Sequence, residues 1–163
     1  MLGARSIQNI DIFKNSKIKE LILSSNSWDN FSDNINQFGN DPENNKKKGD
    51  IFELLTSLYL ISNPIFSSKL NNLWHHSNVP SKIFDSLNLQ RPEIGVDLIA
   101  ESNEGNLWAI QCKYHNDVHK NVSYEEVSTF FSITERDITY KKIRHRIRSE
   151  EHTSELQSPM YLV

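Results

Sequence analysis

The feature that most constrains the fold is a pair of short β-forming runs, residues 94–100 and 107–113, separated by a polar stretch that contains one glycine. Such a pattern predicts an antiparallel β-hairpin. A favoured closure is a three-residue loop, 103–105, with its glycine in the left-handed conformation. This loop places Asp97 opposite Gln111, whereas a two-residue or four-residue loop would shift the pairing by one residue.

Three polar side chains meet on this predicted hairpin. Gln111 and Lys113 are two residues apart on one strand, so they share a face of the sheet, and Asp97 becomes their cross-strand neighbour. Asp97 lies in an apolar run, where burying an unpaired charge is costly, so Lys113 or a cation must compensate it. Oxygen donors favour a hard cation such as Mg²⁺. Such an ion activates water and neutralises charge on a scissile phosphate.

A predicted helix supplies a further acid. Residues 50–62 are apolar on most faces, which predicts a helix buried on several sides, with Asp50 as its N-cap and residues 39–49 as the preceding loop. Asn63 and the proline after it end the helix. Glu53 is the acidic exception within this apolar helix, and we expect it to be a metal ligand, either directly or through water.

The rest of the chain predicts short elements. They are one or two helices within 7–38, a short strand at 73–75, one or two helical turns at 81–87, and a helix at 123–132 that starts with a capping box. The domain organisation we expect is an N-terminal helical segment, 1–45, followed by the domain that carries the polar residues, 46–147.

Each of these residues also has a simpler interpretation. Asp97 can be a structural turn residue, Glu53 a solvated helix residue, and Gln111 and Lys113 ordinary polar groups at a strand end. The remaining candidates favour structural or surface roles. They are Cys112 as a small buried apolar residue, His75 and His76 at the surface or a strand edge, His115, Asp117 and His119 in a loop rather than a metal site, and the basic segments 46–48 and 141–146 as solvated or phosphate-contacting residues.

Five ordered blocks around these residues resemble a known family. They are residues 48–53, 73–74, 93–100, 108–114 and 128–131. Asp97 followed by Gln111-Cys112-Lys113 looks like the Asp…(Asp/Glu)-x-Lys motif of the PD-(D/E)xK nuclease superfamily. Its glutamine variant resembles the Mrr-like branch, and the similarity extends over roughly residues 10–135 to the N-terminal nuclease of single-chain restriction enzymes and related helicases.

The resemblance implies a fold, an activity and roles for the residues. The fold is α/β, a restriction-endonuclease-like mixed sheet flanked by helices, and we expect it to be C-terminally truncated. Asp97, Gln111 and Glu53 would be the metal-side residues and Lys113 the catalytic lysine of an endonuclease that uses Mg²⁺ or Mn²⁺ to hydrolyse DNA. The partners would be DNA and a C-terminal helicase or translocase domain. The alternatives are an inactive DNA-binding module and a repair or junction-resolving nuclease.

The C-terminal segment differs in character from the rest. Residues 148–158 look like the translation of a sequencing adapter, so we expect 148–163 to be non-native; without this segment the net charge of −3 becomes nearly neutral. The sequence has no apolar run of about 18 residues and no signal peptide. Its single cysteine cannot form an internal disulfide, so we expect an intracellular protein rather than a secreted or membrane protein.

Overall fold

The computed structural model describes residues 16–39, 41–87, 95–114, 124–134, 143–150 and 160–162. These residues form an α/β structure, as predicted. Its helical elements are α1 (Ser16–Ser24), α2 (Trp28–Asn36), α3 (Pro42–Ser62), α4 (Pro64–Ser67), the 3₁₀ turn η3 (His76–Asn78), α5 (Ser81–Ser86) and α6 (Tyr124–Thr134). Its strands are β1 (Leu70–His75), β2 (Leu98–Ser102), β3 (Leu107–Lys113), β4 (Ile143–Glu150) and β5 (Met160–Leu162).

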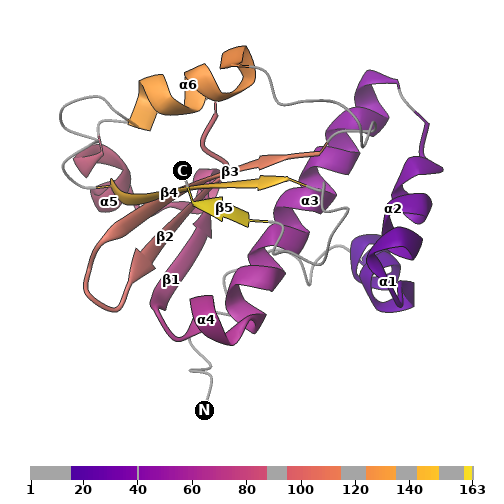
Figure 1. The fold of residues 1–163 in the computed structure, drawn as a ribbon, viewed down its shortest axis with the longest axis horizontal. Coiled ribbons are helices and arrows are strands. Elements are labelled where there is room, and N and C mark those ends of the chain that lie inside the picture. The colour runs from indigo at the N-terminus through magenta and orange to yellow at the C-terminus, as the bar shows by residue number, and fades with distance from the viewer. Residues whose placement is uncertain are drawn as a thin grey trace.

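The five strands form one mixed sheet in the order β1-β2-β3-β4-β5 (Figure 1). The pairs β1–β2, β2–β3 and β4–β5 are antiparallel, and β4 runs parallel to β3. The predicted class, a mixed sheet flanked by helices, is therefore confirmed. The basic segment at 141–146, which sequence reasoning did not assign to the sheet, lies partly in β4 next to the central strand.

The central hairpin has the predicted register. Leu98 pairs with Ile110, and the three following pairs continue in step to the turn. The Ser102 N–H donates to Asn106 O at 2.8 Å, and Gly105 has φ +77°, so the loop is the three-residue closure with a left-handed glycine. The loop length thus fixes which strand residues face each other.

Helices cover both faces of the sheet, because β2 and β3 are apolar on both sides. Ile99 and Ala109 face a cluster that includes Phe130 of α6, and Leu98 and Trp108 face a second cluster with residues of α3 and α4. Figure 1 shows α5 and α6 on the side away from α3. Burial on both faces explains why these strands read as nearly continuous apolar runs.

The N-terminal helices pack against α3 rather than against the sheet. Phe31 and Ile35 of α2 and Ile51 of α3 form a third cluster, and Tyr114 at the end of β3 joins it. The Tyr114 hydroxyl also bonds Asn36 Oδ1 at 2.9 Å. The prediction of one or two helices within 7–38 is confirmed, with two helices, α1 and α2, in that range. Their packing anchors them beside the end of β3.

Helix α3 begins earlier than predicted. Its N-cap is Asp41, whose side chain accepts a hydrogen bond from Asn44 N at 3.0 Å, so residues 42–49 are helical and Asp50 is not the cap. The missed signal is an aspartate followed by proline, the arrangement favoured at the N-cap and first helical position. The predicted end is correct, because Asn63 caps the helix at Ser62. The boundary expected between residues 45 and 46 falls inside α3.

The other predicted features lie only partly within the described residues. The short strand, the turn at 81–87 and the helix after the hairpin appear as β1, α5 and α6, whereas Ser123 of the predicted capping box and the histidines at 115 and 119 lie outside the described residues. β4 continues past Ile147 to Glu150; the adapter origin of 148–163 stays a prediction. No helix in the described part of the chain is long and apolar enough to cross a membrane.

Candidate active site

Asp97 sits where the chain enters the central hairpin. Gly95, with φ +99°, turns the backbone just before it. The Asp97 N–H donates to Ile110 O at 2.9 Å. Ile110 is the partner of Leu98 in the regular β2–β3 pairing, so the bond from Asp97 is shifted by one residue. Asp97 therefore does not pair directly with Gln111 as predicted. Its Oδ2 instead accepts a hydrogen bond from the Cys112 N–H at 2.6 Å, which places the carboxylate at the backbone between Gln111 and Lys113.

The surroundings of the Asp97 carboxyl group disfavour its charged form. Burial raises its pKa from 3.8 to about 6, and the Cys112 N–H acts in the opposite direction. The Glu53 carboxylate raises this pKa further, whereas Lys113 and His75 lower it. These charges can shift the pKa only from nearby, so the site gathers two carboxylates, a lysine and a histidine at one end of the sheet.

Gln111 offers a buried oxygen that lacks a partner. Gln111 is 2% exposed, and its side-chain oxygen, Oε1, makes no hydrogen bond to any of the described residues. A side chain at Gly95 would lie 3.6 Å from the Gln111 amide nitrogen and 3.4 Å from Thr129 of α6, which are ordinary packing contacts, so the amide lies close to the turn that precedes Asp97. Because an unsatisfied buried carbonyl costs about 1–3 kcal/mol, this oxygen is suited to a ligand such as a cation.

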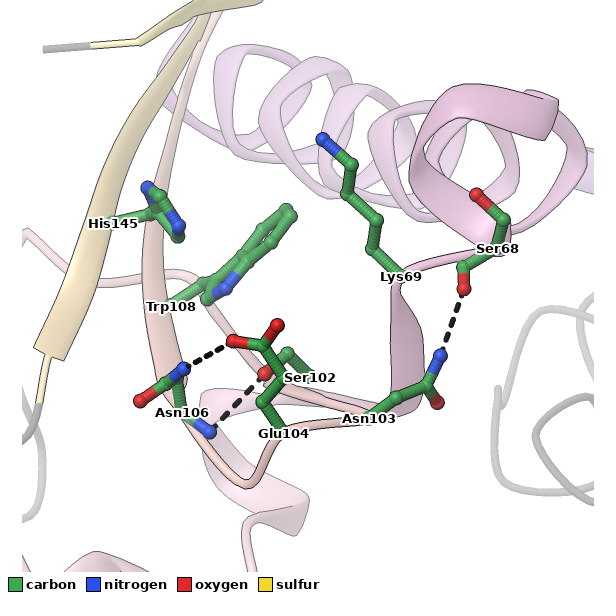
Figure 2. Close-up of a pocket in the computed structure, with 8 residues that line it drawn as sticks. All are labelled: Ser68, Lys69, Ser102, Asn103, Glu104, Asn106, Trp108 and His145. Atoms are coloured by element: carbon green, nitrogen blue, oxygen red, sulfur yellow. Dashed lines mark hydrogen bonds between the residues drawn. The ribbon is translucent and has the colours of Figure 1, made fainter.

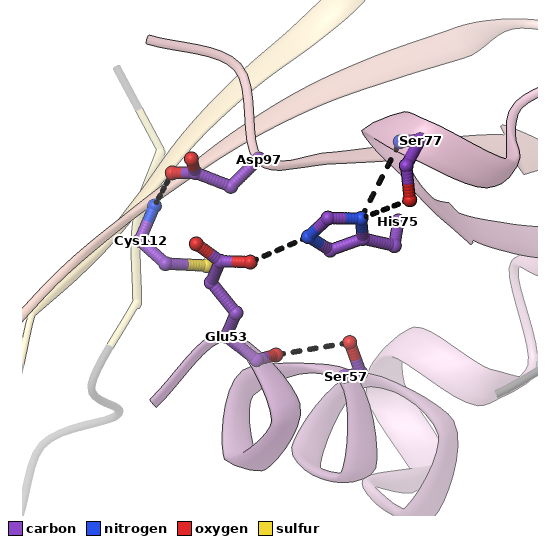
Figure 3. A network of polar contacts seen from close by, with 6 residues as sticks. All are labelled: Glu53, Ser57, His75, Ser77, Asp97 and Cys112. Atoms are coloured by element: carbon purple, nitrogen blue, oxygen red, sulfur yellow. Dashed lines mark hydrogen bonds and ion pairs between the residues drawn. The ribbon is translucent and has the colours of Figure 1, made fainter. Parts of the chain in front are cut away.

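Glu53 reaches the same region from α3. Its Oε2 lies 2.7 Å from His75 Nε2, and His75 Nδ1 in turn contacts Ser77 (Figure 3). The bond with Glu53 raises the pKa of His75, burial opposes this effect, and the charges of Glu53, Asp97 and Asp50 add to it. The sequence predicts His75 at the surface or a strand edge, and the residue does lie at the end of the edge strand β1. The prediction did not include its contact with α3, although its spacing of two from apolar Leu73 indicates the face that α3 covers.

Lys113 completes the set at the end of β3. It is two residues beyond Gln111, and its side chain is half-buried. Two of the lysines that precede α3's apolar part are not free to act in the same way: Lys47 pairs with Glu43 at 2.8 Å, and Lys48 is 1% exposed. Arg146 of the other basic segment bonds Thr134 O at 2.7 Å and fastens β4 to α6.

The donor set fits a hard divalent cation. The Asp97 carboxylate and the Gln111 carbonyl are oxygen ligands, and Glu53 can add another; Mg²⁺ completes such partial sets with water and substrate phosphate. Among the described residues, no group of three histidines, cysteines, aspartates or glutamates forms a metal site alone.

A pocket of about 320 Å³ lies at the other end of the hairpin (Figure 2). It is lined by residues 68–69, by the turn 102–106, and by Trp108 and His145. The five residues of β2 separate this turn from Asp97, a distance of about 17 Å at the rise of an extended strand. The pocket is thus distinct from the candidate active site.

Comparisons with known proteins identify a family for this chain. A family model of restriction endonucleases, of the Mrr-like catalytic type, matches residues 61–154. Among solved structures, an ATP-dependent Type ISP restriction-modification enzyme, LlaBIII bound to DNA, is similar with 26% sequence identity and a TM-score of 0.48, covering 73% of this chain and 6% of that chain. No curated protein matches. From the family match, the chain belongs to the Mrr-like restriction endonucleases, and the nuclease domain that its motifs predict is confirmed.

Proposed function

We propose that this chain hydrolyses DNA phosphodiester bonds in a reaction that requires Mg²⁺ or Mn²⁺. Two observations carry the proposal: the buried Oε1 of Gln111 has no hydrogen-bond partner among the described residues, and the Asp97 carboxylate is held at the backbone of the next residue, Cys112. Family membership supplies the substrate class. A divalent cation, when bound, lowers the pKa of water and offsets charge on the scissile phosphate.

The chain's own residues would bind the cation and orient the water and the phosphate. Asp97 and Gln111 would hold the cation, with Glu53 as a further ligand, direct or through water. The Cys112 N–H fixes one Asp97 oxygen, which leaves the other carboxylate oxygen for the cation. Lys113 would orient the attacking water and donate a hydrogen bond to the phosphate oxygen on which negative charge develops.

The intact protein would contain more than this domain. We infer that a helicase or translocase domain follows the nuclease in the whole protein, since the motifs resemble the N-terminal nucleases of such enzymes. DNA as the substrate also implies an intracellular site of action. A translocase partner explains how a domain without a strongly basic composition finds DNA, because the partner would hold the duplex.

The test is plasmid cleavage by the full chain. We expect cutting in Mg²⁺, no cutting in EDTA, and a loss of about 100-fold or more for Asp97→Ala and Lys113→Ala. Lys82→Ala, an exposed lysine of α5, is the matched control and should cut normally. If Asp97→Ala and Lys113→Ala cut as fast as the wild type, the site assignment is wrong. Wild-type protein that binds DNA but never cuts would support an inactive binding module, and preference for four-way junctions would support a junction-resolving role.

A further inference from the structure

A histidine at the end of β1 links the strand to the acid on α3. His75 Nε2 lies 2.7 Å from Glu53 Oε2, and the two side chains are 39% and 21% exposed. The following residue, His76, donates its backbone N–H to Asp97 O at 2.8 Å. The end of β1 is therefore bonded both to the residue that would hold the cation and to the acid that would assist it.

Ser77 contacts the ring nitrogen of His75 that faces away from Glu53. The Ser77 backbone N–H points at His75 Nδ1 at 3.3 Å, and Ser77 Oγ lies 2.7 Å from the same nitrogen. If Nδ1 accepts, the ring proton is on Nε2, which then donates to Glu53. If the ring is doubly protonated, Nδ1 donates to Ser77 Oγ and Nε2 still donates to Glu53. The direction of the Glu53 contact is the same in both cases.

This contact leaves one Glu53 oxygen available. Figure 3 shows the Glu53 carboxylate between the His75 ring and Cys112, with its second oxygen turned away from the ring, on the side of Asp97. A glutamate has several rotatable bonds, and without a fixed partner it samples many orientations. The bond from His75 selects the one in which the free oxygen faces the candidate cation site.

We propose that His75 is a positioning residue that holds Glu53 by one oxygen so that the other can serve the cation beside Asp97. The proposal rests on the proposed function, since it assumes a cation at that place. Partners that orient metal ligands in this way typically change metal affinity 10-fold to 100-fold when they are lost. A contact that only joined β1 to α3 would change stability and leave metal affinity alone.

The test is Mn²⁺ binding to the full chain, measured by the electron paramagnetic resonance signal of the free ion. His75→Asn and His75→Gln form a matched pair, because both are polar but only the Gln amide reaches the position of Nε2. We expect about 10-fold weaker Mn²⁺ binding for His75→Asn and near-normal binding for His75→Gln. In a Glu53→Ala background, His75→Asn should cause no further loss, since residues that act together are not additive.

Two controls separate the possible failures. Asn72→Ala removes another side-chain contact of β1, the 2.7 Å bond from Asn72 to Glu101, and should lower the melting temperature without changing Mn²⁺ affinity. Asp97→Ala tests the cation site itself. If Asp97→Ala abolishes Mn²⁺ binding but His75→Asn binds normally, the role of His75 is refuted and the proposed function stands. If neither variant changes Mn²⁺ binding, both proposals fail.

Discussion

Replacing Asp97 by asparagine should make the protein more stable at neutral and alkaline pH. Burial raises the pKa of Asp97 from 3.8 to about 6. Between these values the folded protein binds more protons than the unfolded chain, so the free energy of unfolding falls as the pH rises through this window and stays level above it. The full difference corresponds to about 3 kcal/mol. Asparagine is neutral at every pH and can still accept the Cys112 N–H bond.

We expect Asp97→Asn to gain about 2 kcal/mol at pH 8, less than the full difference because the buried amide is itself polar. The assay is urea denaturation in EDTA at several pH values between 4 and 8, in which the gain should shrink as the pH falls and become a small loss near pH 4. Asp85→Asn, at an exposed aspartate of α5, is the matched control. An Asp97→Asn variant that is less stable than the wild type at pH 8, or a difference that is constant with pH, would refute the reasoning.

Three further substitutions test individual contacts. Gly95→Ala forces a side chain onto a backbone with φ +99° and should cost about 1–2 kcal/mol, measured by urea denaturation; an unchanged midpoint would show that this conformation does not strain an alanine. Arg146→Met removes the two bonds to Thr134 and should lower the free energy of unfolding by about 2 kcal/mol, while Arg146→Lys should recover only part of it. Glu53→Gln should lower the pKa of His75, because the Glu53 bond is the largest cause of its rise; an NMR titration that shows no decrease would disprove that cause.

The sequence predicted the central hairpin because its signals are local. Loop length and the glycine at 105 determine the register from Leu98 to Ser102, and the structure agrees. The irregularity at Asp97 was not predictable in this way, because it follows the turn at Gly95, where the backbone has φ +99°. Side-chain alternation along a strand predicts which face of the sheet each side chain lies on, but not the residue at which the strand pairing ends.

The contact between Glu53 and His75 shows a different limit. Both residues were visible, one as an acid in an apolar helix and the other at the end of a short strand, but no local pattern joins α3 to β1. Their pairing follows from how the helix crosses the sheet. Similarly, β4 pairs with β3 across 36 residues at Leu107 and Ile143, and its basic composition gave no strand signal. The start of α3 is the exception, because the capping signal at Asp41 was present in the sequence.

The division of the sheet into a local hairpin and a distant parallel strand has a consequence for the order of folding. The β2–β3 turn closes over a few residues, and hairpins of this kind form in about 1–10 μs. The β3–β4 pairing must close a far longer segment. Because this loses chain entropy before favourable contacts form, the pairing is slower. Gln111 and Lys113 belong to this hairpin, and the Cys112 N–H joins Asp97 to it, so we expect these three residues to reach their relative positions first. The later docking of α3 and β1 then supplies Glu53 and His75 to a site whose frame already exists.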